Sequence, residues 1–299
     1  MNLNLRKFDM SSIDDDKVIV LIGKRDTGKS FLCKDLLYYH QDIPVGTVIS
    51  ATESANQFYG NMVPPLFIHD EYNEEIIQRV LQRQKKAVEK HNQEKEQFNS
   101  SKVDPRGFLI LDDCLYDSSW TKSKHIRSIF MNGRHYKMMF LVTMQYALGI
   151  PPNLRTNIDY VFILRENIVS NRKRIYESYA GMFPTFEIFC QVMDQCTENY
   201  ECLVIFNNAK SNNIEDQVFW YKAEPHSDFK IGADAFWKYH QQNYSKADED
   251  EFDPNAVNRP RNRTVINVQK MTTNGSLTPA MGANNATVQS NQNQNQLLA

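Results

Sequence analysis

The stretch from Val18 to Leu37 constrains the fold of this chain more than any other. Five apolar residues of strand length, Val18–Ile22, precede a segment of the form G-x-x-x-x-G-K-S, and apolar residues at helical spacing follow it. This order of strand, loop and helix gives the motif a structural context, because backbone N–H groups of the loop and of the helix N-terminus bind phosphate oxygens. The segment predicts a nucleoside triphosphate site.

Individual residues of the loop have distinct expected roles. We expect Lys29 to neutralise the β- and γ-phosphate oxygens and Ser30 to place its hydroxyl on Mg²⁺. The alternative, a glycine-containing turn with an incidental lysine, does not account for the flanking strand and helix. The residues expected to surround the phosphates are Gly23, Lys24, Arg25, Asp26, Thr27, Gly28, Lys29 and Ser30.

Composition limits the other possibilities. The 299 residues suffice for one large α/β domain or two small ones, and 34 basic against 36 acidic residues give a net charge of −2. Any contact with nucleic acid must therefore come from a local basic patch. The five cysteines are scattered without a C-x-x-C pair, and neither a signal peptide nor a membrane-length apolar run is evident. We expect a soluble, intracellular protein.

Acidic and amide side chains follow two further apolar strands. Phe108–Leu111 ends in Asp112 and Asp113, and the strand over residues 138–143 is followed by Gln145. Because carboxyl ends of parallel strands face the nucleotide in such sheets, we expect Asp112 to hold Mg²⁺ through water and Asp113 to orient the attacking water. Gln145 would lie beside Asp113, near the γ-phosphate; the alternative is a glutamine that simply ends a strand.

The remaining pattern predicts an α/β fold. A helix is expected over residues 73–98, with a polar distal half that is a solvated face or, alternatively, a partner-binding arm. Strands that alternate with helical stretches indicate a mainly parallel sheet with helices on both faces. We expect one P-loop domain over residues 1–244 and a disordered polar tail over 245–299, where apolar residues are few. The other expected strands are 47–50, 67–70, 160–164, 202–206 and 218–221.

Several of these features occur together with a Gly-Arg-His segment. The phosphate loop, Asp112-Asp113-Cys114, Asn132-Gly133-Arg134-His135 and Gln145 follow one another in this order. Together they resemble the DNA-packaging ATPases of nucleocytoplasmic large DNA viruses, the poxvirus-type branch of the FtsK–HerA superfamily, over roughly residues 10–225. The resemblance implies an ASCE-type P-loop fold and an ATPase that uses Mg²⁺. It further implies a homo-oligomeric ring that translocates double-stranded DNA into a capsid.

The resemblance also implies roles for single residues and a setting for the protein. Gln145 resembles the polar sensor of the family, and Arg134 resembles the arginine finger that completes a neighbour's site, with Arg155 and Arg165 as rival candidates. The wider superfamily usually has Asp-Glu at the strand end, and the shorter Asp113 reaches less far toward the water. The implied partners are capsid portal or vertex proteins, and the implied location is the host cytoplasm (the viral factory) or the virion.

Two basic clusters are candidates for DNA contact, and two other functions compete with the motor. Lys122, Lys124 and Arg127 form one cluster, and residues 172–174 form the other; either could instead be a solvated surface. The competing functions are a P-loop phosphotransferase or GTPase, and a nucleotide-dependent switch or adaptor without DNA translocation. The chain has no N-K-x-D motif for guanine, and the second acid with Gln145 fits water activation better than an acceptor hydroxyl.

Overall fold

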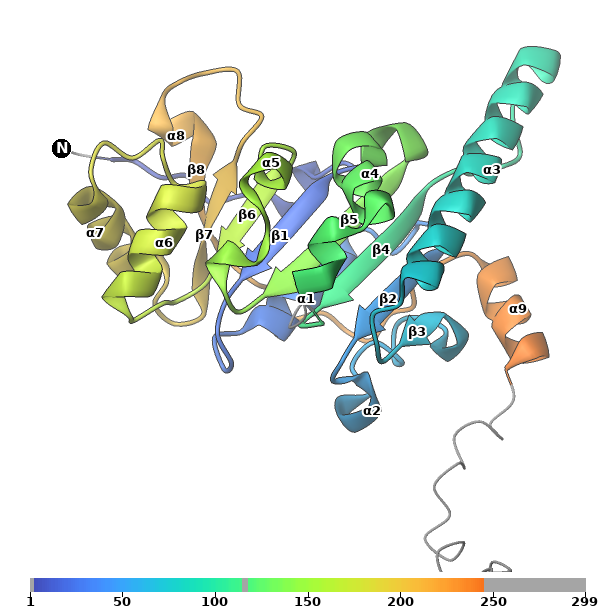
Figure 1. The fold of residues 1–299 in the computed structure, drawn as a ribbon, viewed down its shortest axis with the longest axis horizontal. Coiled ribbons are helices and arrows are strands. Elements are labelled where there is room, and N and C mark those ends of the chain that lie inside the picture. The colour runs from blue at the N-terminus through green and yellow to red at the C-terminus, as the bar shows by residue number, and fades with distance from the viewer. Residues whose placement is uncertain (1–2, 115–117, 245–299) are drawn as a thin grey trace, which may run out of the picture. The chain divides into compact units, whose positions relative to one another are not determined.

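A single mixed β-sheet forms the centre of the computed structural model, which describes residues 3–114 and 118–244 (Figure 1). Within these residues the sheet has 8 strands in the order β3-β2-β4-β5-β1-β6-β7-β8. The strands are β1 (Val18–Ile22), β2 (Gly46–Ser50), β3 (Ile68–His69), β4 (Gly107–Asp112), β5 (Met138–Met144), β6 (Tyr160–Ile163), β7 (Glu201–Phe206) and β8 (Val218–Lys222).

The sheet is parallel from β3 to β6 in this spatial order and antiparallel from β6 through β7 to β8. The prediction of a mainly parallel sheet is confirmed. The short connection accounts for the antiparallel pairing of β7 with β8: only residues 207–217 separate them, and a parallel pair needs a crossover of a dozen or more residues.

Helices cover both faces of the sheet (Figure 1), as expected for an α/β fold. Every residue of β1 is buried: Val18, Val20 and Ile22 pack toward α3, α4, α6 and α7, and Ile19 and Leu21 pack toward α1 and α9. The α-helices are α1 (Lys29–Tyr38), α2 (Glu53–Asn56), α3 (Glu74–Phe98), α4 (Lys124–Asn132), α5 (Pro152–Arg155), α6 (Val169–Tyr179), α7 (Phe186–Cys196), α8 (Ile214–Gln217) and α9 (Asp234–Asn243). The 3₁₀ helices are η1 (Met10–Ser12), η2 (Pro65–Phe67), η3 (Ser118–Lys122), η4 (Gly133–Tyr136) and η5 (Ala147–Gly149).

The long helix α3 has a buried half and a solvated half, as its sequence predicts. Its N-cap Asn73 accepts a hydrogen bond from the Glu75 N–H, and Ile77, Val80 and Leu81 pack into the core. Its buried residues all precede Lys85, and the distal part extends away from the sheet in Figure 1.

Several element boundaries differ from the sequence-based expectation. The third strand consists of Ile68 and His69 alone, because the 3₁₀ helix η2 occupies the preceding residues. The connection between the expected strands 202–206 and 218–221 contains the short helix α8. The predicted tail, 245–299, lies outside the described residues, so its disorder and the domain boundary before it stay predictions. None of the described helices combines the length and the apolar character that crossing a membrane requires.

Candidate nucleotide-binding and hydrolysis site

The phosphate loop connects the end of β1 to α1 and leaves the first turn of that helix open. Gly28 has a φ of 94°, a left-handed conformation that favours glycine, and α1 starts at the next residue. Among the described residues, no side chain caps the first turn of α1. Its N–H groups are therefore oriented for an anion, and the positive end of the helix dipole adds to the attraction. This geometry fits the phosphates of a nucleotide.

Lys29 and Asp113 form an ion pair at the mouth of the loop. The Lys29 Nζ lies 2.5 Å from both carboxylate oxygens of Asp113, and the side chains are 9% and 22% exposed. Asp113 follows the last residue of β4 and has a φ of 48°, a left-handed conformation that aspartate tolerates better than most residues. The turn directs its carboxylate across the sheet edge to the loop.

Gln145 lies beside Asp113, as the sequence predicts. Its Nε2 donates to the Asp113 Oδ2 at 3.1 Å. The two residues meet because β4 and β5 are parallel neighbours and each residue follows the end of its strand. This contact is the one that a polar sensor next to a water-orienting acid requires, although the roles of both residues stay predictions.

Asp112 is held between hydroxyl groups of the two adjacent strands. In the sheet register Asp112 pairs with Ser50 of β2 and with Thr143 of β5. The Thr143 hydroxyl donates to its Oδ1 at 2.5 Å, and the Ser50 hydroxyl donates to its Oδ2 at 3.2 Å. Burial raises the pKa of the Asp112 carboxyl above its ordinary value. Sequence reasoning missed Ser50 and Thr143; the available signal was a hydroxyl residue at the carboxyl end of each apolar strand.

Lys24 is tied to a buried acid that the sequence analysis also missed. Its Nζ lies 2.5 Å from the Glu166 Oε1, and Glu166 also accepts hydrogen bonds from the Ile168 N–H and the Asn171 amide. Although burial acts to raise it, the hydrogen bond from Lys24 helps to hold the pKa of Glu166 below its ordinary value. The sequence signal that could have identified Glu166 was an acid shortly after the apolar strand 160–164. This ion pair connects the loop to the start of α6.

The residues present fit a magnesium ion that is shared with phosphates. Within residues 3–114 and 118–244, no group of three or more His, Cys, Asp or Glu side chains could hold a metal ion alone. Such a group is not required, because Mg²⁺ in phosphate sites is bound by one or two protein oxygens plus substrate phosphates and waters. Asp112 and Ser30, which is exposed in the first turn of α1, are the protein oxygens available.

The three candidate arginines occupy different places. Arg134 lies in η4, just before β5, at the sheet edge opposite the phosphate loop, and its side chain is 63% exposed. Arg155 donates from Nε to the Ile150 carbonyl and packs on the Tyr179 ring. Arg165 follows β6 and so lies at the same sheet edge as its own loop. The structure thus brings Lys29, Asp112, Asp113 and Gln145 together, and it keeps Arg134 away from them.

Comparisons with known proteins show which family the sequence matches. Residues 5–219 match the family described as Poxvirus A32 protein. An uncharacterized protein of Acanthamoeba polyphaga mimivirus is 42% identical over 249 residues, which cover 82% of this chain and 87% of the relative. One from Invertebrate iridescent virus 6 is 42% identical over 248 residues, which cover 82% of this chain and 92% of the relative.

A solved structure shares the fold. The genome packaging NTPase B204 from Sulfolobus turreted icosahedral virus 2, in complex with AMPPCP, aligns over 71% of this chain and 100% of its own. The TM-score is 0.51 and the sequence identity is 14%, a level at which the likeness concerns the fold alone. The family match and the identity to the viral relatives go further, and they confirm the resemblance stated from the sequence: the chain belongs to the poxvirus A32 protein family.

Proposed function

We propose that this protein is an ATP-hydrolysing motor that translocates double-stranded viral DNA into a capsid. The observation that carries the proposal is the convergence of Lys29, Asp113 and Gln145 at one sheet edge. Membership of the viral family and the fold shared with a genome packaging NTPase support it. The site favours a hydrolase over a phosphotransferase or a switch, because an acid with an adjacent amide suits the activation of water.

Binding and activation are coupled through one ion pair. The first turn of α1 receives the phosphates, and Lys29 then exchanges the Asp113 carboxylate for phosphate oxygens. Asp113 is thereby freed to accept a hydrogen bond from the attacking water, with Gln145 still beside it. Asp113 thus stays paired with Lys29 until a nucleotide binds, so it does not activate water in the empty site.

The metal, when bound, neutralises charge on the phosphates. Ser30 would bind it directly. Asp112 would act through a water, and each of its oxygens, which accepts one hydrogen bond from Thr143 or Ser50, keeps a second lone pair for that water. These two hydroxyls fix the orientation of the carboxylate, as partners of metal-binding groups generally do.

Arg134 would complete the site of a neighbouring subunit in a ring. Its exposed side chain lies 3.9 Å (Nη2) from the Asp159 Oδ1, a distance at which the pair is weak, so the guanidinium can reach another molecule. Arg155 is held by a carbonyl and an aromatic ring of its own subunit, and this makes it the less suitable finger. A finger of this kind contributes about 10³–10⁵ in rate by stabilising transition-state charge.

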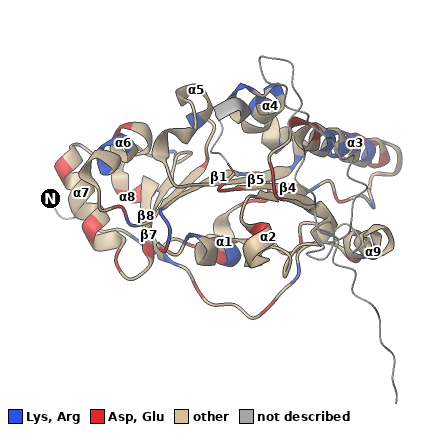
Figure 2. Ribbon diagram, turned by 60° about the horizontal axis from the view of Figure 1, so that its bottom comes forward, with Lys and Arg blue, Asp and Glu red and all other residues tan. Residues whose placement is uncertain are grey.

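The basic residues around α4 are the better candidates for DNA contact. Lys122, Lys124 and Arg127 are exposed, and among the described residues none of them forms an ion pair. In the other cluster, Arg172 pairs with Asp194, and Arg174 lies over the Tyr146 ring. In the ribbon of Figure 2, basic residues are marked on α4, and residues of both charges are marked along α3. Phosphate contacts without base readout are what a translocating motor needs.

The remaining assignments follow from this function. Capsid portal or vertex proteins would be the partners of the ring, and the viral factory or the virion would be the place of action. We propose these on the strength of the packaging role alone.

ATP turnover with and without duplex DNA tests the proposal. The parent protein should hydrolyse ATP and be stimulated by DNA, whereas Lys29→Ala should lose on the order of 10²–10³ in rate because phosphate charge is no longer neutralised. Lys34→Ala is the matched control, since this lysine lies on the same helix and forms an ion pair with the exposed Asp228. Turnover only with an acceptor substrate would indicate a kinase, and binding without turnover would indicate a switch.

A second measurement tests the DNA surface. Replacing Lys122 and Lys124 together by glutamine should abolish DNA stimulation, leave basal turnover unchanged and reduce the salt dependence of DNA binding. Lys173→Gln removes an exposed lysine of the other cluster and serves as the comparison. DNA binding that falls with Lys173→Gln alone would move the contact to α6.

A further inference from the structure

An exposed tyrosine lies against the phosphate loop and has no role in the mechanism above. Tyr200 is 68% exposed, although it belongs to a large aromatic type that normally packs into the core or finds a partner. A β-carbon placed on Gly28 would lie 3.2 Å from its Cδ1, so the ring borders the loop at the residue before α1. The ring therefore presents a free face next to the phosphate site.

The backbone conformation of Tyr200 is unfavourable for a tyrosine. The Glu201 N–H donates to the Glu198 carbonyl at 2.8 Å and closes a turn whose central residues, Asn199 and Tyr200, have φ values of 49° and 64°. Positive φ at both central positions is typical of a type I′ turn, which favours Asn first and Gly second. A bulky residue in place of Gly is strained, and strain of this kind gathers at binding sites. Neither turn preference nor burial explains the tyrosine.

The position of Tyr200 relative to the hydrolysis residues gives it a function. Asp113 and Gln145 follow β4 and β5, on one side of β1, and thereby mark the γ-phosphate end of the site. Tyr200 directly precedes β7, whose Leu203 pairs with Ile163 at the end of β6, on the other side of β1. A triphosphate bound along the loop with its γ-phosphate at Asp113 would direct its nucleoside toward β6 and β7.

We propose that Tyr200 is the side chain on which the nucleobase of the bound nucleotide stacks. This rests on the proposed function, since it assumes that the loop binds a nucleoside triphosphate. Every base has a π-face, so stacking adds affinity without selecting adenine over guanine. Because the ring borders the loop at Gly28, a stacked base would lie close to the first turn of α1, where the phosphates would bind.

Calorimetric titration of two ligands tests the proposal: Mg²⁺–ADP, which has a base, and Mg²⁺–tripolyphosphate, which has none. Tyr200→Ala should weaken ADP binding about 5- to 100-fold and leave tripolyphosphate binding unchanged, while Tyr200→Phe should retain the parental affinity for both. Tyr239→Ala is the matched control. Tyr239 is also exposed, but it lies on α9, and its ring contacts Phe67 of η2. In a Tyr200→Trp protein, ADP should quench the added fluorescence and tripolyphosphate should not.

The outcomes separate this proposal from the proposed function. Equal weakening of both ligands in Tyr200→Ala would show that the turn merely shapes the loop, and unchanged binding of both would show that the ring is unused; either result overturns stacking. In both cases Lys29→Ala would still lose both ligands, and the nucleotide site itself would stand. Binding of neither ligand by the parent protein would overturn both proposals together.

Discussion

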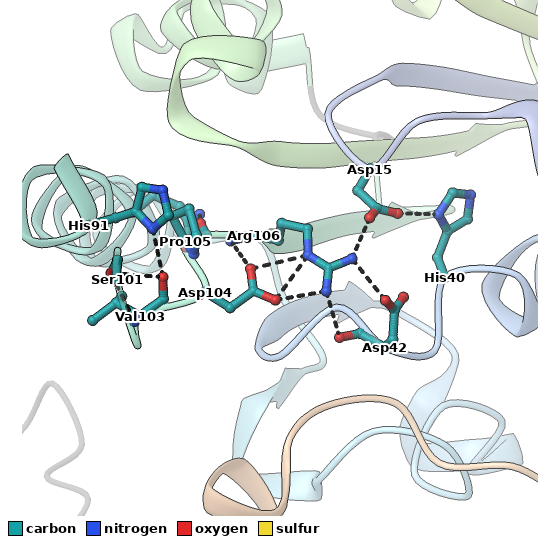
Figure 3. A network of polar contacts seen from close by, with 10 residues as sticks. Asp15, His40, Asp42, His91, Ser101, Val103, Asp104, Pro105 and Arg106 are labelled. Carbon is teal, nitrogen blue, oxygen red and sulfur yellow. Dashed lines mark hydrogen bonds and ion pairs between the residues drawn. The ribbon is translucent and has the colours of Figure 1, made fainter. Parts of the chain in front are cut away.

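The two edges of the sheet carry charged clusters that are built differently. At the carboxyl edge, Lys29 forms an ion pair with Asp113, and that acid has a second contact with Gln145. At the amino edge, Arg106 lies just before β4 and contacts three acids, Asp15, Asp42 and Asp104 (Figure 3). His40, which follows α1, contacts Oδ1 of Asp15, and Arg106 contacts Oδ2 of the same carboxylate.

From this difference we expect the carboxyl-edge ion pair to exchange partners on nucleotide binding and the amino-edge network to keep its partners. Arg106 uses Nε, Nη1 and Nη2, and its bidentate contact with Asp104 is the strong form of this pair. Lys29 is a compact charge that pairs, among the described residues, with one carboxylate, and we expect phosphate oxygens to replace that carboxylate. We therefore expect the Arg106 network to stabilise the fold and the Lys29–Asp113 pair to take part in nucleotide binding.

The pKa directions reflect the same contrast. Although burial acts to raise it, hydrogen bonds from His40 and Arg106 hold the pKa of Asp15 below its ordinary value, and contacts with Arg106 do the same for Asp104. Asp15 and Asp104 are therefore stabilised in their charged form. At the carboxyl edge burial prevails and raises the pKa of Asp112, so this carboxylate is charged at a cost in stability.

The largest expected effect tests whether the amino edge is only structural. Arg134→Ala should bind ATP normally and hydrolyse it about 10³–10⁵-fold more slowly if Arg134 acts in a neighbour's site. Mixing this variant with Asp113→Asn should restore part of the activity, because some interfaces then combine an intact acid with an intact arginine. Strict additivity in a sample shown to form mixed oligomers would contradict the trans role and direct attention to Arg165 or Arg155.

The second-largest expected effect is the loss of turnover in a variant of Asp113, which we expect to differ in role from Asp112. Asp113→Asn should keep nucleotide binding and lose roughly 10²–10⁴ in turnover, because the water is no longer oriented by a carboxylate. Asp112→Asn should also reduce the Mg²⁺ dependence of nucleotide affinity. Titration of ATP binding against Mg²⁺ in both variants checks this, and equal Mg²⁺ dependence would contradict the assignment.

Replacing Arg106, which contacts all three acids of the amino-edge network, should lower stability and leave catalysis unchanged. Arg106→Gln leaves three carboxylates without their shared partner and should cost about 1–3 kcal/mol of unfolding free energy, which lowers Tm by about 2–10 °C. Turnover per folded molecule should stay parental. Arg79→Gln is the control, because Arg79 makes a single exposed ion pair within α3.

The same variant has a defined pH dependence. Because the folded pKa values of Asp15 and Asp104 are lowered, their contribution is present above the ordinary aspartate pKa and is lost as pH falls through the lower folded values. The Tm difference between Arg106→Gln and the parent should therefore be largest near neutral pH and shrink below about pH 4. A constant difference down to pH 3 would mean that packing, and not charge, is lost.

The smallest expected effect is an unchanged or slightly raised Tm in a variant of Asp112. The raised pKa of Asp112 means that its ionised form costs stability at pH 7, so Asp112→Asn should leave Tm unchanged or raise it by about 1–3 °C. The gain should vanish below the ordinary aspartate pKa, where the parental side chain is itself neutral. A clear fall in Tm at pH 7 would show that the hydrogen bonds from Thr143 and Ser50 outweigh the burial of charge.

The sequence by itself determined the fold class, the phosphate loop and the residues that end the central strands. These features are local: strand, loop and helix follow one another between Val18 and Leu37, and strand ends carry Asp112, Asp113 and Gln145 within a few residues. The parallel arrangement then brings the strand ends to one edge, which is why the contact between Gln145 and Asp113 was predictable.

Only the tertiary structure decided the contacts between segments that are distant in sequence. Ser50 and Thr143 meet Asp112 through the register of three strands, and a polar residue at a strand end does not specify its register. Glu166 reaches Lys24, and Tyr200 reaches Gly28, because β6 lies next to β1 and β7 runs antiparallel beyond it. Strand order and orientation arise from packing of the whole sheet, and for that reason no local pattern contains them.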